Sequence, residues 1–177
     1  SNICSEAALK VLSEYLRRPS TMERFDYNAD CLIEAIGIVL RSNIIKFGDI
    51  FAVQKKGVAM GICPAPSIAI IFFAIHEEFL MSKWSGSIMF YLRFIDDVFG
   101  IWLTSPNYVA DNRQWNNFQD DVNDFHGLPW EFIPRSTTVQ FMDLTVSIEG
   151  ERLSTDLFEK PMALYLYIPP HSTLGTA

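Results

Sequence analysis

The most constraining feature of this sequence is a pair of adjacent aspartates, Asp96 and Asp97, inside a run of strand-forming residues at positions 90–102. An unpaired charge in a low-dielectric interior is costly, so an ordinary buried strand does not accommodate two carboxylates between Ile95 and Val98. Two arrangements would offset the cost of these two charges. Either the pair lies at the turn of a β-hairpin and reaches water, or it binds a divalent cation that reverses the penalty. The second arrangement needs support from other segments of the chain.

The size and composition of the chain indicate a folded, acidic protein. Its 177 residues are enough to bury one substantial core, and we expect a single domain over residues 1–177. Hydrophobic residues make up 49% of the chain, which excludes intrinsic disorder. The net charge of −7 counts against a stand-alone nucleic-acid-binding protein, because such proteins normally present a basic surface.

The three cysteines, Cys4, Cys31 and Cys63, lie far apart and form no C-x-x-C motif. This spacing indicates neither a disulfide framework nor a zinc site. We therefore expect an intracellular, reducing compartment, although the sequence does not identify which one. A secretory signal or transit peptide is not visible at the start of the sequence.

Apolar residues at helical spacing predict four helices. In the first, Leu9, Leu12 and Leu16 share a face and Pro19 ends the segment; Asn28 is a suitable N-cap for the second. The third carries an unbroken apolar run. We expect it to be buried on most of its surface, too short and too Pro-bounded to span a membrane, with His76 at the helix surface. The predicted helices cover residues 5–18, 28–43, about 66–75 and 111–125.

The strand predictions place hairpins on both sides of this third helix. Residues 44–47 and 50–54 flank Gly48-Asp49 and predict a tight β-hairpin. The alternation of apolar residues within 138–148 changes phase near Met142 and Asp143, which predicts a bulge in a single strand. Further strands are expected at 130–133 and 153–158. The elements together predict an α+β fold, an antiparallel sheet with helices on one face.

The segment at residues 54–67 combines glycines, prolines and two lysines, and it precedes the third helix. Gly57 and Gly61 allow a backbone to approach a ligand closely, and Pro66 suits the first turn of a helix. A structural connection and a ligand-binding loop are both consistent with this composition.

Two motifs in this order resemble the palm domain of reverse transcriptases, and most closely the Penelope-like retroelement branch. The first is Gln54-x-x-Gly57-x-x-Met60-Gly61-x-x-x-Ala65-Pro66, and the second is Arg93-Phe94-Ile95-Asp96-Asp97-Val98-Phe99. Downstream, Val139-Gln140-Phe141-Met142-Asp143-Leu144 and Phe158-Glu159-Lys160-Pro161 are similar to the same branch. The resemblance covers residues 1 to about 172.

The resemblance implies nucleotidyl transfer by two metal ions, Mg²⁺ or Mn²⁺, on an RNA template with a DNA primer and a deoxynucleoside triphosphate. Carboxylates hold such ions roughly 4 Å apart, so that one activates the primer hydroxyl and the other steadies the leaving pyrophosphate. Asp96 is then the principal metal ligand and catalytic residue, and Asp97 is a weaker or indirect one. The residues implied in nucleotide or template binding are Gln54, Gly57, Met60, Gly61 and Lys160.

The sequence also departs from the family pattern. The family's third catalytic aspartate lies just upstream of a motif whose tail resembles Ser1-Asn2-Ile3, so this chain begins after it. Ile70 stands where the family usually has Asn, and Cys4 replaces a proline. The fingers and thumb are also missing from this stretch. We therefore expect the site to be incomplete for catalysis in this polypeptide.

Two functions of different classes follow. The first is an RNA-directed DNA polymerase of which this chain is the palm. The second is a domesticated or decayed fragment that serves as a non-catalytic structural subunit, bound to protein partners in a larger assembly. The second function predicts exposed apolar surface, because a palm without fingers and thumb lacks part of its cover.

Overall fold

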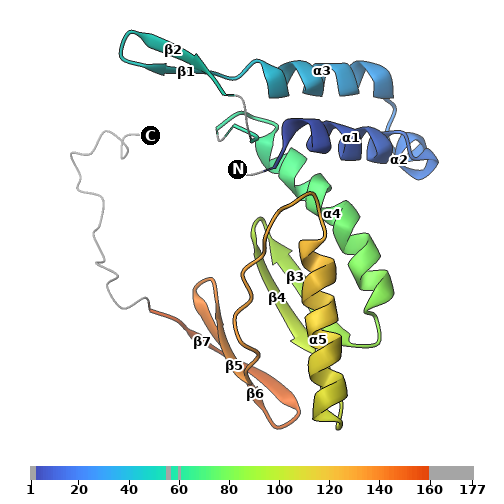
Figure 1. The fold of residues 1–177 in the computed structure, drawn as a ribbon, viewed down its shortest axis with the longest axis vertical. Helices are drawn as coiled ribbons and strands as arrows, with labels where there is room; N and C mark the ends of the chain where they lie inside the picture. The colour runs from blue at the N-terminus through green and yellow to red at the C-terminus, as the bar shows by residue number, and fades with distance from the viewer. Residues whose placement is uncertain (1–2, 55–56, 60, 160–177) are drawn as a thin grey trace. The chain divides into compact units, whose positions relative to one another are not determined.

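The computed structural model describes residues 3–54, 57–59 and 61–159, and the chain divides into two compact units, Ser1–Phe132 and Ile133–Ala177. The first unit contains helices and antiparallel strands, and the described part of the second unit contains antiparallel strands (Figure 1). The elements of the first unit are α1 (Ser5–Leu16), α2 (Pro19–Arg24), α3 (Ala29–Arg41), β1 (Ile44–Phe47), β2 (Ile50–Val53), α4 (Ala65–Lys83), β3 (Ile88–Phe94), β4 (Asp97–Trp102) and α5 (Tyr108–Asn123). Those of the second are β5 (Thr138–Phe141), β6 (Leu144–Glu149) and β7 (Arg152–Leu157).

Helices α1 and α3 form where the sequence predicts helical spacing. The Asn28 side chain accepts a hydrogen bond from the Cys31 N–H at 3.0 Å, which confirms the predicted cap of α3. Pro19 does end α1, but it also occupies the first position of α2, a short helix that the sequence analysis did not predict. Leu12 of α1, Leu40 of α3 and Phe72 of α4 share one buried core.

Helix α4 differs from its prediction in both burial and length. Only 22% of the most apolar 18-residue stretch of α4 is buried. The buried residues form one stripe along the helix, Ile68, Phe72, His76 and Leu80. The expected burial on most sides is therefore wrong, and so is the surface position of His76, which is 7% exposed. Among the described residues, α4 is long and apolar enough to cross a membrane, so the expectation that this segment is too short is wrong. One such helix is weak evidence of a crossing, because the core helix of a soluble protein can have the same length and composition.

Strands β3 and β4 form an antiparallel hairpin with α4 and α5 packed on one face (Figure 1). Trp102 packs against Leu80 of α4 and Phe118 of α5, in a second core. The other face carries Phe90 and Leu92, both exposed. Cross-strand partners project from the same face of a hairpin, so Phe99, which pairs with Leu92, lies on that outer face as well.

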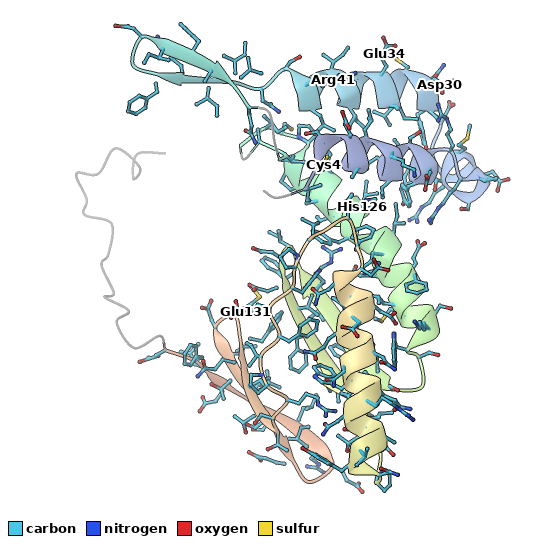
Figure 2. The ribbon with its side chains drawn as sticks, viewed as in Figure 1. Cys4, Asp30, Glu34, Arg41, His126 and Glu131 are labelled. Carbon is cyan, nitrogen blue, oxygen red and sulfur yellow. The ribbon has the colours of Figure 1, made fainter. Side chains whose placement is uncertain are left out.

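Helix α5 begins earlier than predicted because Asn107 caps it. Its side chain accepts a hydrogen bond from the Ala110 N–H at 3.1 Å. The buried Asp111 accepts hydrogen bonds from the Trp102 indole at 3.1 Å and from the Ser105 N–H at 3.0 Å, which fastens the β4–α5 connection. After the helix, His126 lies in the bend that leads away from α5 (Figure 2), at a φ of 51°.

The β1–β2 hairpin is confirmed, with Phe47 paired to Ile50 around Gly48-Asp49. Every residue of both strands is exposed. Phe47 is 84% exposed, although the hairpin is mostly apolar. An isolated two-stranded hairpin is marginally stable in water, so this hairpin is expected to be among the less stable parts of the first unit.

The second unit contains a three-stranded antiparallel meander in the order β5-β6-β7. The bulge predicted near Met142 and Asp143 is wrong, because these residues form a two-residue turn that divides the predicted strand into β5 and β6.

The strand predicted at 130–133 is also wrong, because these residues form no strand. The Trp130 N–H donates to the Asn123 side chain at 2.7 Å, and both Trp130 and Phe132 pack against the α5 core.

The described part of the chain is therefore a mixture of helices and antiparallel sheets, as an α+β fold requires. Its strands form three separate sheets, of two, two and three strands, rather than one continuous sheet. Within the first unit, α4 and α5 cover one face of the β3–β4 hairpin.

Candidate active site

Asp96 and Asp97 lie at the tip of the β3–β4 hairpin. Phe94 pairs with Asp97, which leaves Ile95 and Asp96 as a two-residue turn. Ile95 has a φ of 55°, and Asp96 is not among the residues with positive φ. Positive φ at the first turn residue alone is the pattern of a type II′ turn, in which glycine is normally favoured. A β-branched residue in this conformation is strained, and such strain persists only where the surrounding structure enforces it.

The two carboxylates both reach water, which is the first of the two arrangements that the sequence allowed. They are not equivalent. Asp97 begins β4 and, as the partner of Phe94, projects from the outer face of the hairpin, whereas Asp96 occupies the turn itself. Solvent access removes the need for a cation to offset their charge, and it leaves both groups able to bind one.

A partly buried ion pair anchors this hairpin to α4. The Arg93 Nε donates to Glu77 Oε1 at 2.5 Å and its Nη2 donates to Glu77 Oε2 at 3.0 Å, a bidentate geometry. The Arg93 and Glu77 side chains are only 9% and 15% exposed. The Tyr91 hydroxyl donates to the same Glu77 Oε1 at 2.7 Å. The hairpin face opposite Asp97 is therefore tied to the helix by three polar side chains.

The same cluster fixes the protonation of Tyr91. Burial, and then its hydrogen bond to Glu77, raise the pKa of the Tyr91 hydroxyl far above its usual range. The phenol therefore remains a hydrogen-bond donor to Glu77 at any physiological pH. The cluster of Arg93, Glu77 and Tyr91, called the anchor below, was not predicted from the sequence. An arginine inside an apolar strand was the available signal, because a buried guanidinium requires a carboxylate or carbonyl partner.

The Gly/Pro segment forms a loop that is bonded within itself and to α1. The Gln54 Nε2 donates to the Gly57 carbonyl at 3.2 Å, and the Ser5 hydroxyl donates to the same oxygen at 3.4 Å. Gly57 and Gly61 have φ values of 80° and 89°, which explains the two glycines by backbone conformation. Met60 and Lys160, the other residues implied in nucleotide or template binding, lie outside the described residues.

Gln54 also lines an open pocket of about 440 Å³ between the β1–β2 hairpin and the loop. Its lining is mostly apolar, and its polar side chains come from Gln54 and Asn43; the lining residues are Asn43, Ile44, Ile45, Gln54, Val58, Ala59 and Ile62. A few polar groups in an apolar concavity are typical of ligand sites, but this pocket is wide open to solvent.

The structure brings the predicted site residues together in two groups. Gln54 and Gly57 are joined by their hydrogen bond, and Asp96 and Asp97 by their turn. Within the described residues, neither carboxylate has a hydrogen bond or ion pair to the loop. The connection between the groups is α4, which follows the loop and whose Ile70 carbonyl accepts a hydrogen bond from Arg93 Nη2 at 3.1 Å.

The acid pair suits a hard cation in ligand type but not in ligand number. Mg²⁺ binds carboxylate oxygens and usually retains waters or substrate oxygens, which two exposed aspartates at a turn can accommodate. Across residues 3–54, 57–59 and 61–159, however, no group of three or more His, Cys, Asp or Glu side chains could hold a metal ion. This part of the chain supplies Asp96 and Asp97 as donors, and a further carboxylate would have to come from elsewhere.

Comparisons with known proteins give no family for this chain. No protein-family model, curated protein or solved structure matches it.

Proposed function

We propose that this chain is the palm-like part of an RNA-directed DNA polymerase of the reverse-transcriptase type, incomplete for catalysis as it stands. The observation that carries the proposal is the Asp96-Asp97 pair at the tip of a strained hairpin turn, anchored to the helix that follows the Gly/Pro loop. Exposed adjacent carboxylates on a rigidly held turn are what a metal-dependent nucleotidyl transfer needs. The finer fold proposal, a palm, rests on the helices that cover one face of β3–β4.

In this proposal Asp96 is the principal ligand of Mg²⁺ or Mn²⁺, and Asp97 assists it. The metal, when bound, would activate the primer hydroxyl and stabilise the leaving pyrophosphate. The loop residues would contact the incoming nucleotide or the template. Gln54 and Gly57 belong to this set and lie in the described loop; the full set is Gln54, Gly57, Met60, Gly61 and Lys160.

Primer extension on an RNA template tests the proposal. The full-length protein containing this chain is assayed with Mg²⁺ and with Mn²⁺, in parallel with residues 1–177 alone. We expect extension by the full-length protein to vanish in the Asp96→Asn variant. Asp49→Asn is the matched control, because Asp49 occupies the same turn position in the β1–β2 hairpin. Extension that survives Asp96→Asn would rule out the proposed role of this carboxylate.

A non-catalytic structural subunit is the second candidate. The observation that favours it is the exposed apolar surface on the outer face of β3–β4, at Phe90, Leu92 and Phe94, and on both strands of β1–β2. Large exposed apolar patches mark protein–protein interfaces. Light scattering of the purified chain over a range of concentrations tests it. A soluble, well-folded monomer at high concentration would contradict the subunit function, since such surface then needs no partner.

A further inference from the structure

The Arg93 guanidinium makes four hydrogen bonds, and one of them reaches the turn that carries Asp96. Two go to the Glu77 carboxylate and one to the Ile70 carbonyl, all on α4. The fourth runs from Arg93 Nη1 to the Ile95 carbonyl at 3.0 Å. This oxygen belongs to the peptide that joins Ile95 to Asp96. A single side chain therefore connects the helix to the central peptide of the turn.

The orientation of this central peptide decides the conformation of Asp96. Type I′ and type II′ turns share a positive φ at the first turn residue and differ by a flip of the central peptide. After the flip, the second residue changes from a φ of about −80° to a positive φ. Ile95 has the positive φ and Asp96 does not, so the peptide is in the type II′ orientation. The hydrogen bond from Arg93 holds the Ile95 oxygen in that orientation.

The Arg93–Glu77 pair has further contacts of its own. Glu77 is oriented by the Tyr91 hydroxyl as well as by Arg93, and the guanidinium lies 5.7 Å from the centroid of the Phe73 ring. Lysine could not replace this arrangement, because an ammonium lacks the planar fork that bonds a carboxylate and two carbonyls at once. The position two residues before the turn holds Lys46, Gln140 and Ile148 in the hairpins β1–β2, β5–β6 and β6–β7, so the arginine is particular to the turn with the acid pair.

We propose that Arg93 is a positioning residue, which locks the Ile95-Asp96 peptide against α4 and thereby sets the direction of the Asp96 carboxylate. The importance of that direction for metal binding rests on the proposed function. The restraint of the turn by Arg93 does not rest on the proposed function. The restraint and its effect on metal binding can therefore be tested separately.

Nuclear magnetic resonance of the isotope-labelled chain tests the lock without any enzymatic activity. The Overhauser pattern between Ile95 and Asp96 distinguishes the two peptide orientations, and exchange broadening reports a flip. We expect one conformation in the wild type and two in Arg93→Lys. Arg18→Lys is the matched control, because Arg18 makes an exposed ion pair with Glu78, the next residue of α4, in which its Nη1 donates to both carboxylate oxygens. A single, wild-type turn conformation in Arg93→Lys would overturn the proposal.

Paramagnetic broadening by added Mn²⁺ tests the consequence for the metal. We expect the apparent Mn²⁺ affinity at Asp96 to fall about 10-fold or more in Arg93→Lys, the usual effect of losing a group that orients a ligand, and to be unchanged in Arg18→Lys. Equal affinity in Arg93→Lys and the wild type would overturn the positioning role. A wild-type chain that shows no broadening at Asp96 or Asp97 would instead overturn the proposed metal site, while the turn spectra would still decide the lock.

Should Arg93→Lys fail to fold, Glu77→Gln replaces it. Glutamine keeps the shape of the side chain and one oxygen for Arg93 but removes the charge that holds the guanidinium. The expected result is a folded chain with increased exchange broadening at Ile95 and Asp96. Unchanged signals at these two residues would contradict the proposal.

Discussion

The hairpins β1–β2 and β3–β4 have the same design at their turns and opposite surroundings. Each closes through two residues, the first at positive φ and the second an aspartate. In β1–β2 the first residue is Gly48, and all residues of the strands are exposed. In β3–β4 it is Ile95, and the partly buried Arg93 connects the turn to α4.

The difference shows where this fold can hold a strained backbone. A left-handed conformation costs a non-glycine residue roughly 1–2 kcal/mol, which a marginal, exposed hairpin cannot sustain. Glycine removes that cost at position 48. At position 95 the hydrogen bonds of Arg93 and the packing of β3 on α4 compensate it. The acid pair therefore lies on a strained turn that the hydrogen bonds of Arg93 connect to α4.

The largest effect is expected from breaking the anchor. Glu77→Ala leaves the Arg93 charge buried without its carboxylate, which should lower the free energy of unfolding by about 3–5 kcal/mol. Urea denaturation followed by circular dichroism measures it. Arg17→Met provides the contrast, because the Arg17–Asp30 pair is exposed and should contribute at most about 1 kcal/mol. Similar losses in the two variants would show that the anchor is not special.

The pH dependence of stability should differ between the β1–β2 hairpin and the part of the molecule that contains α4 and β3–β4. Burial lowers the pKa of His76, the neighbour of Glu77, below 6.5. As the pH falls through 6.5, the unfolded chain takes up a proton that the folded chain refuses, so the folded state loses stability toward acid. The slope is at most about 1.4 kcal/mol per pH unit for one proton.

Denaturation of wild type and His76→Gln at several pH values measures this contribution. We expect a shallower slope in the variant, since it cannot take up the proton. Amide exchange within β1–β2, corrected for its intrinsic pH dependence, should not follow His76, because that hairpin contains no histidine. Identical slopes in both proteins would contradict the assignment.

Exchanging the turn residues probes the strain directly. Gly48→Ala should destabilise the β1–β2 hairpin by about 1 kcal/mol, because alanine resists positive φ although the space for its Cβ is open. Its amides should then exchange about fivefold faster. Ile95→Gly should change stability by less than about 0.5 kcal/mol, since relief of strain is opposed by the greater freedom of glycine in the unfolded chain. A large loss in Ile95→Gly would show that the Ile95 side chain itself stabilises the turn.

The smallest effect is expected on the exposed face of β1–β2. Phe47→Ser should change the unfolding free energy by no more than about 0.5 kcal/mol, because the ring is already in solvent. Phe72→Ala, in the core, should cost about 3–5 kcal/mol in the same denaturation experiment. A cost above 1 kcal/mol for Phe47→Ser would mean that this hairpin is covered in solution.

Much of the local structure followed from the sequence, because local chemistry determines it. The cap at Asn28, the glycine turn at Gly48 and the position of the acid pair at a hairpin tip all depend on a few neighbouring residues. The turn at Met142-Asp143 was mistaken for a bulge because methionine is not a turn signal. Met142 nevertheless has a φ of 57°, a conformation that favours glycine.

The anchor of the candidate site could not be predicted in the same way. Arg93 and Glu77 are separated by the end of α4, a turn and most of β3, and nothing local in the sequence pairs them. The burial of His76 likewise depends on α5 and the residues after it. Its Nε2 lies 3.2 Å from the Val122 carbonyl of α5, and its ring stacks on Phe125, which follows the helix. Sequence patterns find which residues carry the chemistry, whereas packing between helices decides which residues hold them in place.

All three cysteines are exposed, and they occupy different parts of the first unit. Cys4 lies at the start of α1 (Figure 2), Cys31 lies in α3, and Cys63 lies in the Gly/Pro loop. Thiol-reactive probes can therefore be attached without opening the core. With Cys4 and Cys31 changed to serine, a fluorophore on Cys63 would report whether added nucleotide or RNA binds at the loop.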